Sequence, residues 1–171
     1  MRHRNRLLAA ATPADLALLE TRLESVQLKN RDVLEAPNKP IEHIYFPETC
    51  VASALSFAGP DQRIEIGLIG CEGMSASPIV MGDTRSPHSV YIQIPGEALR
   101  IRTDQFCALL DKSLSLRMFL LKFAQVLMVQ AAQTVVANGR AKLHERMARW
   151  ILMAPTELSA TTCRSRKSPC R

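Results

Sequence analysis

The sequence predicts an α+β protein, in which an antiparallel β-roll of jelly-roll-like type lies between a short N-terminal helix and a long C-terminal helix. Three observations lead to this fold class. A helix-start motif lies near the N-terminus, short β-branched runs fill the range 26–101, and a long apolar segment follows residue 113. Of the 171 residues, 47% are hydrophobic and 22% are charged, which is enough apolar material for the core of one ordinary domain.

The N-terminal helix is predicted from the run Thr12-Pro13-Ala14-Asp15. The Thr12 hydroxyl can cap free backbone N–H groups, Pro13 suits the first helical position, and Asp15 lies near the positive end of the helix dipole. An apolar face over two turns then follows, formed by Leu16, Leu19 and Leu23.

Seven short strands are predicted between residues 26 and 101. Each is a β-branched or apolar run, and Pro, Gly, Asn and Asp separate one run from the next. The runs are 26–29, 32–35, 41–46, 51–57, 63–69, 90–94 and 98–101. Strands of this length and spacing are typical of a sandwich, a jelly roll or a barrel.

Helices are predicted for the remainder of the chain up to residue 154. Thr103 and Asp104 can cap a short helix that reaches about Leu110, and a longer helix begins at Ser113 or Ser115. The dipeptide at 138–139, Asn-Gly, is an ordinary place for that helix to end or bend, and a further helix is expected over 140–154.

The long helix carries two apolar stripes, so it must be covered on two sides. The first stripe is a heptad seam through Leu116, Leu120, Phe123, Leu127, Gln130 and Thr134. The second stripe contains Leu121, Ala124, Met128, Ala132 and Val135. One side suits the protein's own β domain and the other suits a second copy of the chain. We assign the first stripe to a homodimer interface; the alternative is an internal core helix of a monomer.

The charge distribution argues against a nucleic-acid surface on the folded part. The formal net charge is +6, but residues 1–6 and 161–171 hold seven of the 22 basic residues and no acidic ones, which leaves fifteen basic against 16 acidic residues. We therefore interpret the basic ends as solvated termini.

Other function classes find little support. The five cysteines, at 50, 71, 107, 163 and 170, have no zinc or cluster spacing, and an odd number does not suit a secreted disulfide framework. His43 and His88 have no metal-ligating neighbours at a suitable spacing, so each is expected to be a surface or satisfied histidine. Polar residues interrupt the apolar range 114–137, which predicts no membrane span, and no enzyme motif occurs. A reduced, cytoplasmic, non-enzymatic protein without a metal cofactor is expected.

Several runs resemble the Crp/Fnr family of bacterial transcription regulators. They are Ile41-Glu42-His43-Ile44-Tyr45-Phe46-Pro47, the turn from Ile66 to Met74, Ala137-Asn138-Gly139-Arg140, and Leu143 to Leu152 with its Glu-Arg-Met-Ala-Arg-Trp-Ile-Leu core. The resemblance covers about residues 7–154. It implies a cyclic-nucleotide-binding-type sensor roll over 7–112, a dimerisation helix over 113–138, and the first helix of a winged helix-turn-helix domain over 139–154.

The resemblance also implies a ligand site, in which a Gly-Glu turn and a later Arg-Ser pair would hold a cyclic phosphate and its ribose. The matching residues are Gly70, Glu72, Gly73, Arg85 and Ser86. Two departures weaken the match: Pro87 stands where the family has Ala, and Glu72 and Arg85 are thirteen residues apart rather than ten. A cyclic nucleotide, another small effector and a roll without a ligand therefore stay open.

The range 155–171 is expected to be a disordered tail, because its Ser, Arg, Cys and Pro residues show no apolar periodicity that could place a recognition helix. The hypothesis is thus a sensor and dimerisation module whose direct DNA binding is lost through truncation. The alternative is a stand-alone ligand-binding or interaction module that forms heterodimers with full-length relatives.

Overall fold

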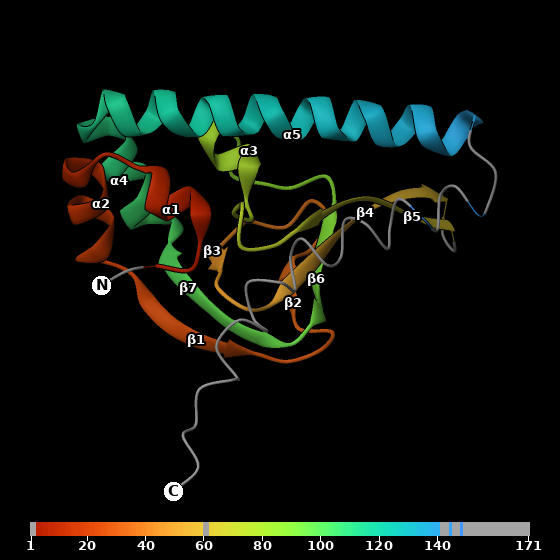
Figure 1. Ribbon diagram of the computed structural model, residues 1–171, viewed down its shortest axis with the longest axis horizontal. Coiled ribbons are helices and arrows are strands. Elements are labelled where there is room, and N and C mark those ends of the chain that lie inside the picture. The colour runs from red at the N-terminus through yellow and green to blue at the C-terminus, as the bar shows by residue number, and fades with distance from the viewer. Residues whose placement is uncertain (1–2, 60–61, 141–143, 145–147, 149–171) are drawn as a thin grey trace, which may run out of the picture.

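Two antiparallel sheets form the body of the molecule, and helices gather at one end and along one side (Figure 1). The computed structural model describes residues 3–59, 62–140, 144 and 148. One sheet has the strand order β1-β7-β3, formed by Glu24–Leu28, Gly96–Arg102 and His43–Pro47. The other has the order β2-β6-β4-β5, formed by Val33–Glu35, Ser89–Ile94, Val51–Gly59 and Gln62–Ile69. The predicted α+β roll is confirmed, and each of the seven predicted strands is found with its ends shifted by a few residues.

The helices comprise α1 (Arg6–Ala10), α2 (Pro13–Glu20), α3 (Ser77–Val80), α4 (Thr103–Lys112) and α5 (Leu114–Arg140). The prediction for α2 is confirmed in detail, since the Thr12 hydroxyl accepts the backbone N–H of Asp15 at 3.2 Å. The sequence analysis missed α1 and α3, because five and four residues are too few to show a helical period.

A buried asparagine ties the N-terminal segment to the roll. The side-chain amide of Asn5 donates hydrogen bonds to the carbonyls of Pro47 at 2.9 Å and of Gly73 at 2.8 Å. Its carbonyl oxygen accepts the N–H of Leu8 and so caps α1. Asn5 is fully buried, so these contacts satisfy a polar group that would otherwise be costly to enclose.

The apolar core has two parts. The larger part joins α1, α2 and α4 to α5, and its fully buried side chains include Phe46, Phe106 and Leu116. The smaller part lies between the two sheets and includes Cys50, Ile92 and Ala98. The rings of Phe46 and Phe106 meet edge to face with their centroids 6.3 Å apart, a favoured aromatic arrangement.

The start of α5 is fixed by a carboxylate from α2. Asp15, only 2% exposed, accepts hydrogen bonds from the hydroxyls of Ser113 at 2.6 Å and Ser115 at 2.9 Å. These bonds, the Ser113 bond first among them, lower the pKa of Asp15 below its usual value. The first turn of α5 is therefore attached to the N-terminal helices.

The two α5 stripes are not separated as predicted, because Leu116 and Leu120 of the first stripe and Ala124 of the second are all buried against the roll. Leu116 and Leu120 are 0% and 1% exposed and lie in the larger core, so they are enclosed by the chain's own domain and cannot face a second chain. On the opposite side, Leu114, Met118 and Val129 are 72%, 49% and 52% exposed. The sequence could not decide between the stripes because both are apolar over their first turns. Figure 1 shows α5 along one side of the roll, with one flank open to solvent.

The helix does not end at residues 138–139, because α5 continues through them to Arg140; the other predicted possibility, a bend at this place, stays a prediction. The predicted helix over 139–154 and the predicted tail over 155–171 fall almost entirely outside the described residues.

One stretch of α5 is long and apolar enough to cross a membrane by length and composition alone. It covers Leu114–Val136, with a mean hydropathy of 1.4. Helices that protein covers on two sides have the same composition, and the inner side of α5 is already packed against the roll at Leu116, Leu120 and Ala124. The absence of a membrane span stays a prediction.

Candidate ligand-binding site

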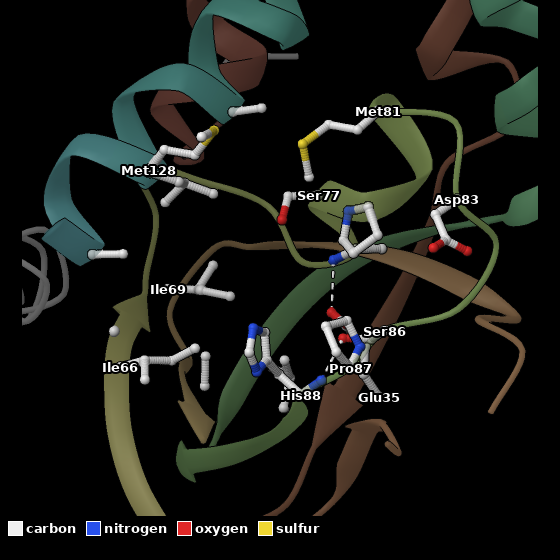
Figure 2. Close-up of a pocket in the computed structure, with 18 of the residues that line it drawn as sticks. Glu35, Ile66, Ile69, Ser77, Met81, Asp83, Ser86, Pro87, His88 and Met128 are labelled. Atoms are coloured by element: carbon white, nitrogen blue, oxygen red, sulfur yellow. Dashed lines mark hydrogen bonds between the residues drawn. The ribbon is translucent and has the colours of Figure 1, made fainter. Parts of the chain in front are cut away.

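A cavity of about 500 Å³ lies between the inner side of α5 and the four-stranded sheet (Figure 2). Its size is typical of small-molecule sites. The sheet contributes Glu35, Ala54, Ile66, Gly67, Leu68, Ile69 and Val90, and α5 contributes Ala124, Leu127, Met128, Gln130 and Ala131. The segment between β5 and β6 supplies Ala76, Ser77, Pro78, Met81, Asp83, Arg85, Ser86, Pro87 and His88. The lining is mostly apolar, and most of its polar groups come from the segment between β5 and β6, with Glu35 from the sheet and Gln130 from α5.

The predicted ligand residues divide into two groups. Arg85 and Ser86 line the cavity, whereas Gly70, Glu72 and Gly73 do not. The predicted cassette is therefore not assembled around one space. Its first half belongs to a turn that packs below α5, and only its second half reaches the cavity.

The turn at 70–73 is held by its own contacts. One carboxylate oxygen of Glu72, Oε1, accepts the N–H of Gly70 at 3.0 Å, and the other, Oε2, is buried without a hydrogen-bond partner among the described residues. A Cβ at Gly73 would lie 3.0 Å from Cζ of Phe123 on α5. Gly73 thus permits a close approach of loop and helix, which gives this glycine a packing role.

The Arg85 side chain is bound at the rim of the cavity. Its Nη1 donates to the carbonyl of Asn38 at 2.8 Å, and its backbone N–H donates to the Asp83 carboxylate at 3.0 Å. Arg85 and Asp83 are both exposed, and the guanidinium of Arg85 is bonded to a backbone carbonyl.

Glu35 is a site residue that the sequence analysis missed. It is 4% exposed, and its Oε1 accepts the N–H of Ala76 at 2.7 Å (Figure 2). The hydroxyl of Ser86 also bonds to it. Burial raises the pKa of this carboxyl, and the two hydrogen bonds, from Ala76 and Ser86, oppose that shift. A carboxylate ending the short run Val33-Leu34-Glu35 was the only available signal.

Ala76, which donates to Glu35, has an uncommon backbone conformation. Its φ of 60° and ψ of 36° lie in the left-handed region, which costs a non-glycine residue about 1 kcal/mol or more. It is the N-cap of α3, so the Glu35 contact holds the segment at the point where it turns into the helix. Such strain is often found at ligand-binding segments.

His88 differs from the surface or satisfied histidine that was expected. Its ring is partly buried, and its Nδ1 is buried without a hydrogen-bond partner in the described part of the chain. Burial lowers the pKa of His88 below 6.5, so the imidazole is neutral at pH 7. Figure 2 shows the ring extending on the same side as Ile66 and Ile69.

Among the described residues, the metal-ligating side chains do not gather into a metal site, and two of the cysteines are buried. Within the residues searched, no group of three or more His, Cys, Asp or Glu side chains could hold a metal ion. Cys50 and Cys71 are buried, and burial raises the pKa of Cys50 to about 11, which keeps that thiol protonated.

Comparisons with known proteins give relatives in structure but not in sequence. No family model matches the chain, and no curated protein matches it closely enough to count. Among solved structures, a putative Crp/Fnr-family transcriptional regulator from Eubacterium rectale has a TM-score of 0.72 at 10% identity, over 90% of this chain and 72% of that one. A cyclic nucleotide-binding domain from Methylobacillus flagellatus has a TM-score of 0.65 at 10% identity, over 81% and 84% of the two chains.

A third similar structure is CLP of Xanthomonas campestris, described as a c-di-GMP responsive global regulator. Its TM-score is 0.64 at 12% identity, over 82% of this chain and 70% of CLP. At these identities the likeness concerns the fold and not the ligand. The chain has the fold of the cyclic-nucleotide-binding-type sensor domains of Crp/Fnr regulators, with the long helix that follows them.

Proposed function

We propose that this chain is the effector-sensing and dimerisation module of a Crp/Fnr-like regulator. A small effector binds in the cavity between the roll and α5, and the outer side of α5 pairs with α5 of a second copy. The observation that carries the proposal is that one helix serves both surfaces. Leu127 and Ala131 line the cavity, whereas Val126 and Val129 on the same turns of α5 are 62% and 52% exposed.

The sharing of α5 gives the effector a route to the dimer. A ligand that contacts Leu127 and Ala131 binds better to one position of α5 than to another, and so shifts the population between two packings. Because the same helical turns carry the outer apolar residues, the shift changes how two copies meet. The DNA-reading domains of an intact regulator would follow that change.

The outer side of α5 has the composition of an interface. Its exposed apolar side chains are Leu114, Met118, Val126, Val129, Val135 and Val136. Exposed apolar surface on this scale marks an interaction site in a water-soluble protein. Homodimerisation would bury it.

Sedimentation equilibrium of the full chain tests the dimer. We expect twice the mass of the chain for the wild type and a shift to the single-chain mass for Val129→Glu, because a charge in an apolar interface is costly to bury. Ala108→Glu, on the exposed side of α4, is the matched control and should keep the dimer. A single-chain mass for the wild type at all concentrations contradicts the proposal.

Two finer points belong to the same proposal. We infer that direct DNA binding by this chain is weak or absent and that the module acts in the cytoplasm. A salt-dependent, sequence-specific shift of duplex DNA by the purified chain would contradict the first. Recovery of the chain in the membrane fraction after cell lysis would contradict the second.

The alternative is an interaction module that pairs with full-length relatives, and the exposed stripe on α5 favours it equally. Co-expression with an intact paralogue separates the two. A mixed dimer, detected by mass in the purified complex, supports the alternative, whereas homodimers alone support a self-pairing sensor.

A further inference from the structure

The cavity's own chemistry indicates which class of effector it takes, if the proposed sensor function holds. The groups suited to an anion are already bonded to Glu35. The N–H of Ala76 at the start of α3 donates to its carboxylate at 2.7 Å, and the Ser86 hydroxyl bonds to the same carboxyl. Glu35 and Ser86 are 4% and 2% exposed, so this internal arrangement is enclosed by protein.

The remaining charged groups do not favour a negative ligand. Among the described residues of the lining, the carboxyl groups are those of Glu35 and Asp83, and the guanidinium is that of Arg85. The Arg85 head group donates outward to the carbonyl of Asn38 at 2.8 Å. A phosphate that entered would have to displace Glu35 from its donors, the N–H of Ala76 and the hydroxyl of Ser86.

The rest of the lining suits an apolar molecule with one polar group. Ile66, Ile69, Leu127 and Met128 form apolar walls on both sides of the space. Nδ1 of His88 is buried without a partner among the described residues, and an unsatisfied buried polar atom costs about 1–3 kcal/mol. Nδ1 has almost no accessible surface and so does not face the space; the other ring nitrogen, Nε2, is the one that a ligand hydroxyl, carbonyl or amide can meet.

We propose that Glu35 occupies the donors that an anionic ligand would need in this cavity, and that the effector is an uncharged, mostly apolar small molecule that hydrogen-bonds to His88. The inference rests on the proposed sensor function and specifies its ligand class. It also explains why the predicted phosphate cassette is only half assembled around the cavity.

Two dyes of one skeleton test the charge preference directly. N-phenyl-1-naphthylamine is uncharged, and 1-anilinonaphthalene-8-sulfonate carries one added negative charge. Titrated into the full chain at pH 7, the uncharged dye should bind at least tenfold more tightly. Cyclic AMP, measured by calorimetry, should show no saturable binding.

Two variants locate the binding. Ala131→Trp fills the cavity from α5 and should abolish binding of the uncharged dye, whereas Ala108→Trp on the exposed side of α4 should leave it unchanged. This pair separates the cavity from the exposed apolar side of α5. Circular dichroism melting confirms that each variant is folded.

A third variant tests the role of Glu35. Glu35→Ala frees the donors at Ala76 and Ser86, so the sulfonate dye should bind at least fivefold more tightly while the uncharged dye changes little. Glu35→Gln keeps an oxygen acceptor in place and should show no such gain. If Glu35→Ala does not fold, two measurements still test the inference. They are the ratio of the two dye affinities in the wild type and the comparison of Ala131→Trp with Ala108→Trp.

The outcomes distinguish failure of the uncharged-effector inference from failure of the proposed sensor function. Tighter binding of the sulfonate dye or of cyclic AMP by the wild type, lost in Ala131→Trp, overturns the uncharged-effector inference and leaves the sensor proposal standing. Dye binding that Ala131→Trp does not change, or no saturable binding of any probe, overturns both.

Discussion

The two sides of α5 have similar apolar content but opposite surroundings. The inner side, with Leu116, Leu120 and Ala124 at 4% exposure or less, completes the chain's own core. The outer side, with Met118 and Val129 about half exposed, is not covered by the described part of the chain. The difference shows that hydrophobicity alone does not tell whether a helix face stabilises the fold or an assembly. Mutations on the two sides should therefore affect different equilibria.

The largest effect is expected at the inner side. Leu120→Ala removes most of a side chain that is 1% exposed, so the free energy of unfolding should fall by about 2–5 kcal/mol at every protein concentration. Met118→Ala, two residues earlier on the outer side, should lower the melting temperature only at concentrations where the wild type is dimeric. Urea and thermal unfolding over a hundredfold range of concentration measure both. Equal, concentration-independent losses would show that the two sides do not differ.

Leu127→Glu tests whether Leu127 lies in the cavity wall or in the dimer interface, because the sequence alone placed this residue in the dimer seam. The structure places it in the wall of the cavity. The variant should keep the dimer mass in sedimentation but bind the uncharged dye at least tenfold more weakly, since a carboxylate then enters the apolar wall. Val129→Glu should show the reverse pattern. A single-chain mass for Leu127→Glu would restore the original seam.

Gly73→Ala tests the close contact between the loop and the inner side of α5. Because the added methyl would meet Phe123 at 3.0 Å, we expect a loss of about 1–3 kcal/mol in the free energy of unfolding. Gly67→Ala is the control, since a Cβ at that position meets nothing within 4 Å. Equal stability of the two variants would mean that Phe123 moves aside without cost.

The smallest effects concern pH, and two buried carboxyl groups should act in opposite directions. The pKa of Asp15 is lowered on folding, so its stabilising contribution is present above pH 3.8 and is lost as the pH falls through its folded value. The pKa of Glu35 is raised, so its contribution is complete below pH 4.5 and is lost as the pH rises through its folded value.

Urea midpoints between pH 3 and pH 8 measure these slopes. Asp15→Asn should flatten the acid side of the stability curve, and Glu35→Gln should flatten the side above pH 4.5. Asp111→Asn on the exposed end of α4 is a control that should change neither slope. Identical curves for Asp15→Asn and the wild type would show that the hydroxyl contacts of Asp15 contribute no pH dependence.

Much of the fold could be predicted because its signals are local. Thr12 and Pro13 begin α2 through side-chain and φ preferences that act within one turn, and each strand is a short β-branched run between turn residues. The faces of α5 could not be assigned in this way. Which side Leu120 takes depends on where the roll lies, and this is a property of the tertiary structure.

The site was harder to predict than the fold. Arg85 and Ser86 were found because a motif marks them, and both line the cavity. Glu35 could not be found, because its partner Ala76 is 41 residues away and no local pattern connects the two. The unsatisfied nitrogen of His88 is likewise defined by its surroundings and not by its neighbours in sequence.

Because α5 is held at its first turn, a tilt of the helix moves its far end more than the part near the attachment. Asp15 holds Ser113 and Ser115, so the fixed point lies at the N-terminal end. At a rise of about 1.5 Å per residue, Leu127 lies roughly 20 Å along the helix and Arg140 roughly 39 Å. A tilt about the fixed end therefore moves the far end about twice as far as it moves the wall of the cavity. Under the proposed sensor function, a ligand that displaced the helix slightly would produce its largest movement at the far end of α5, near Arg140.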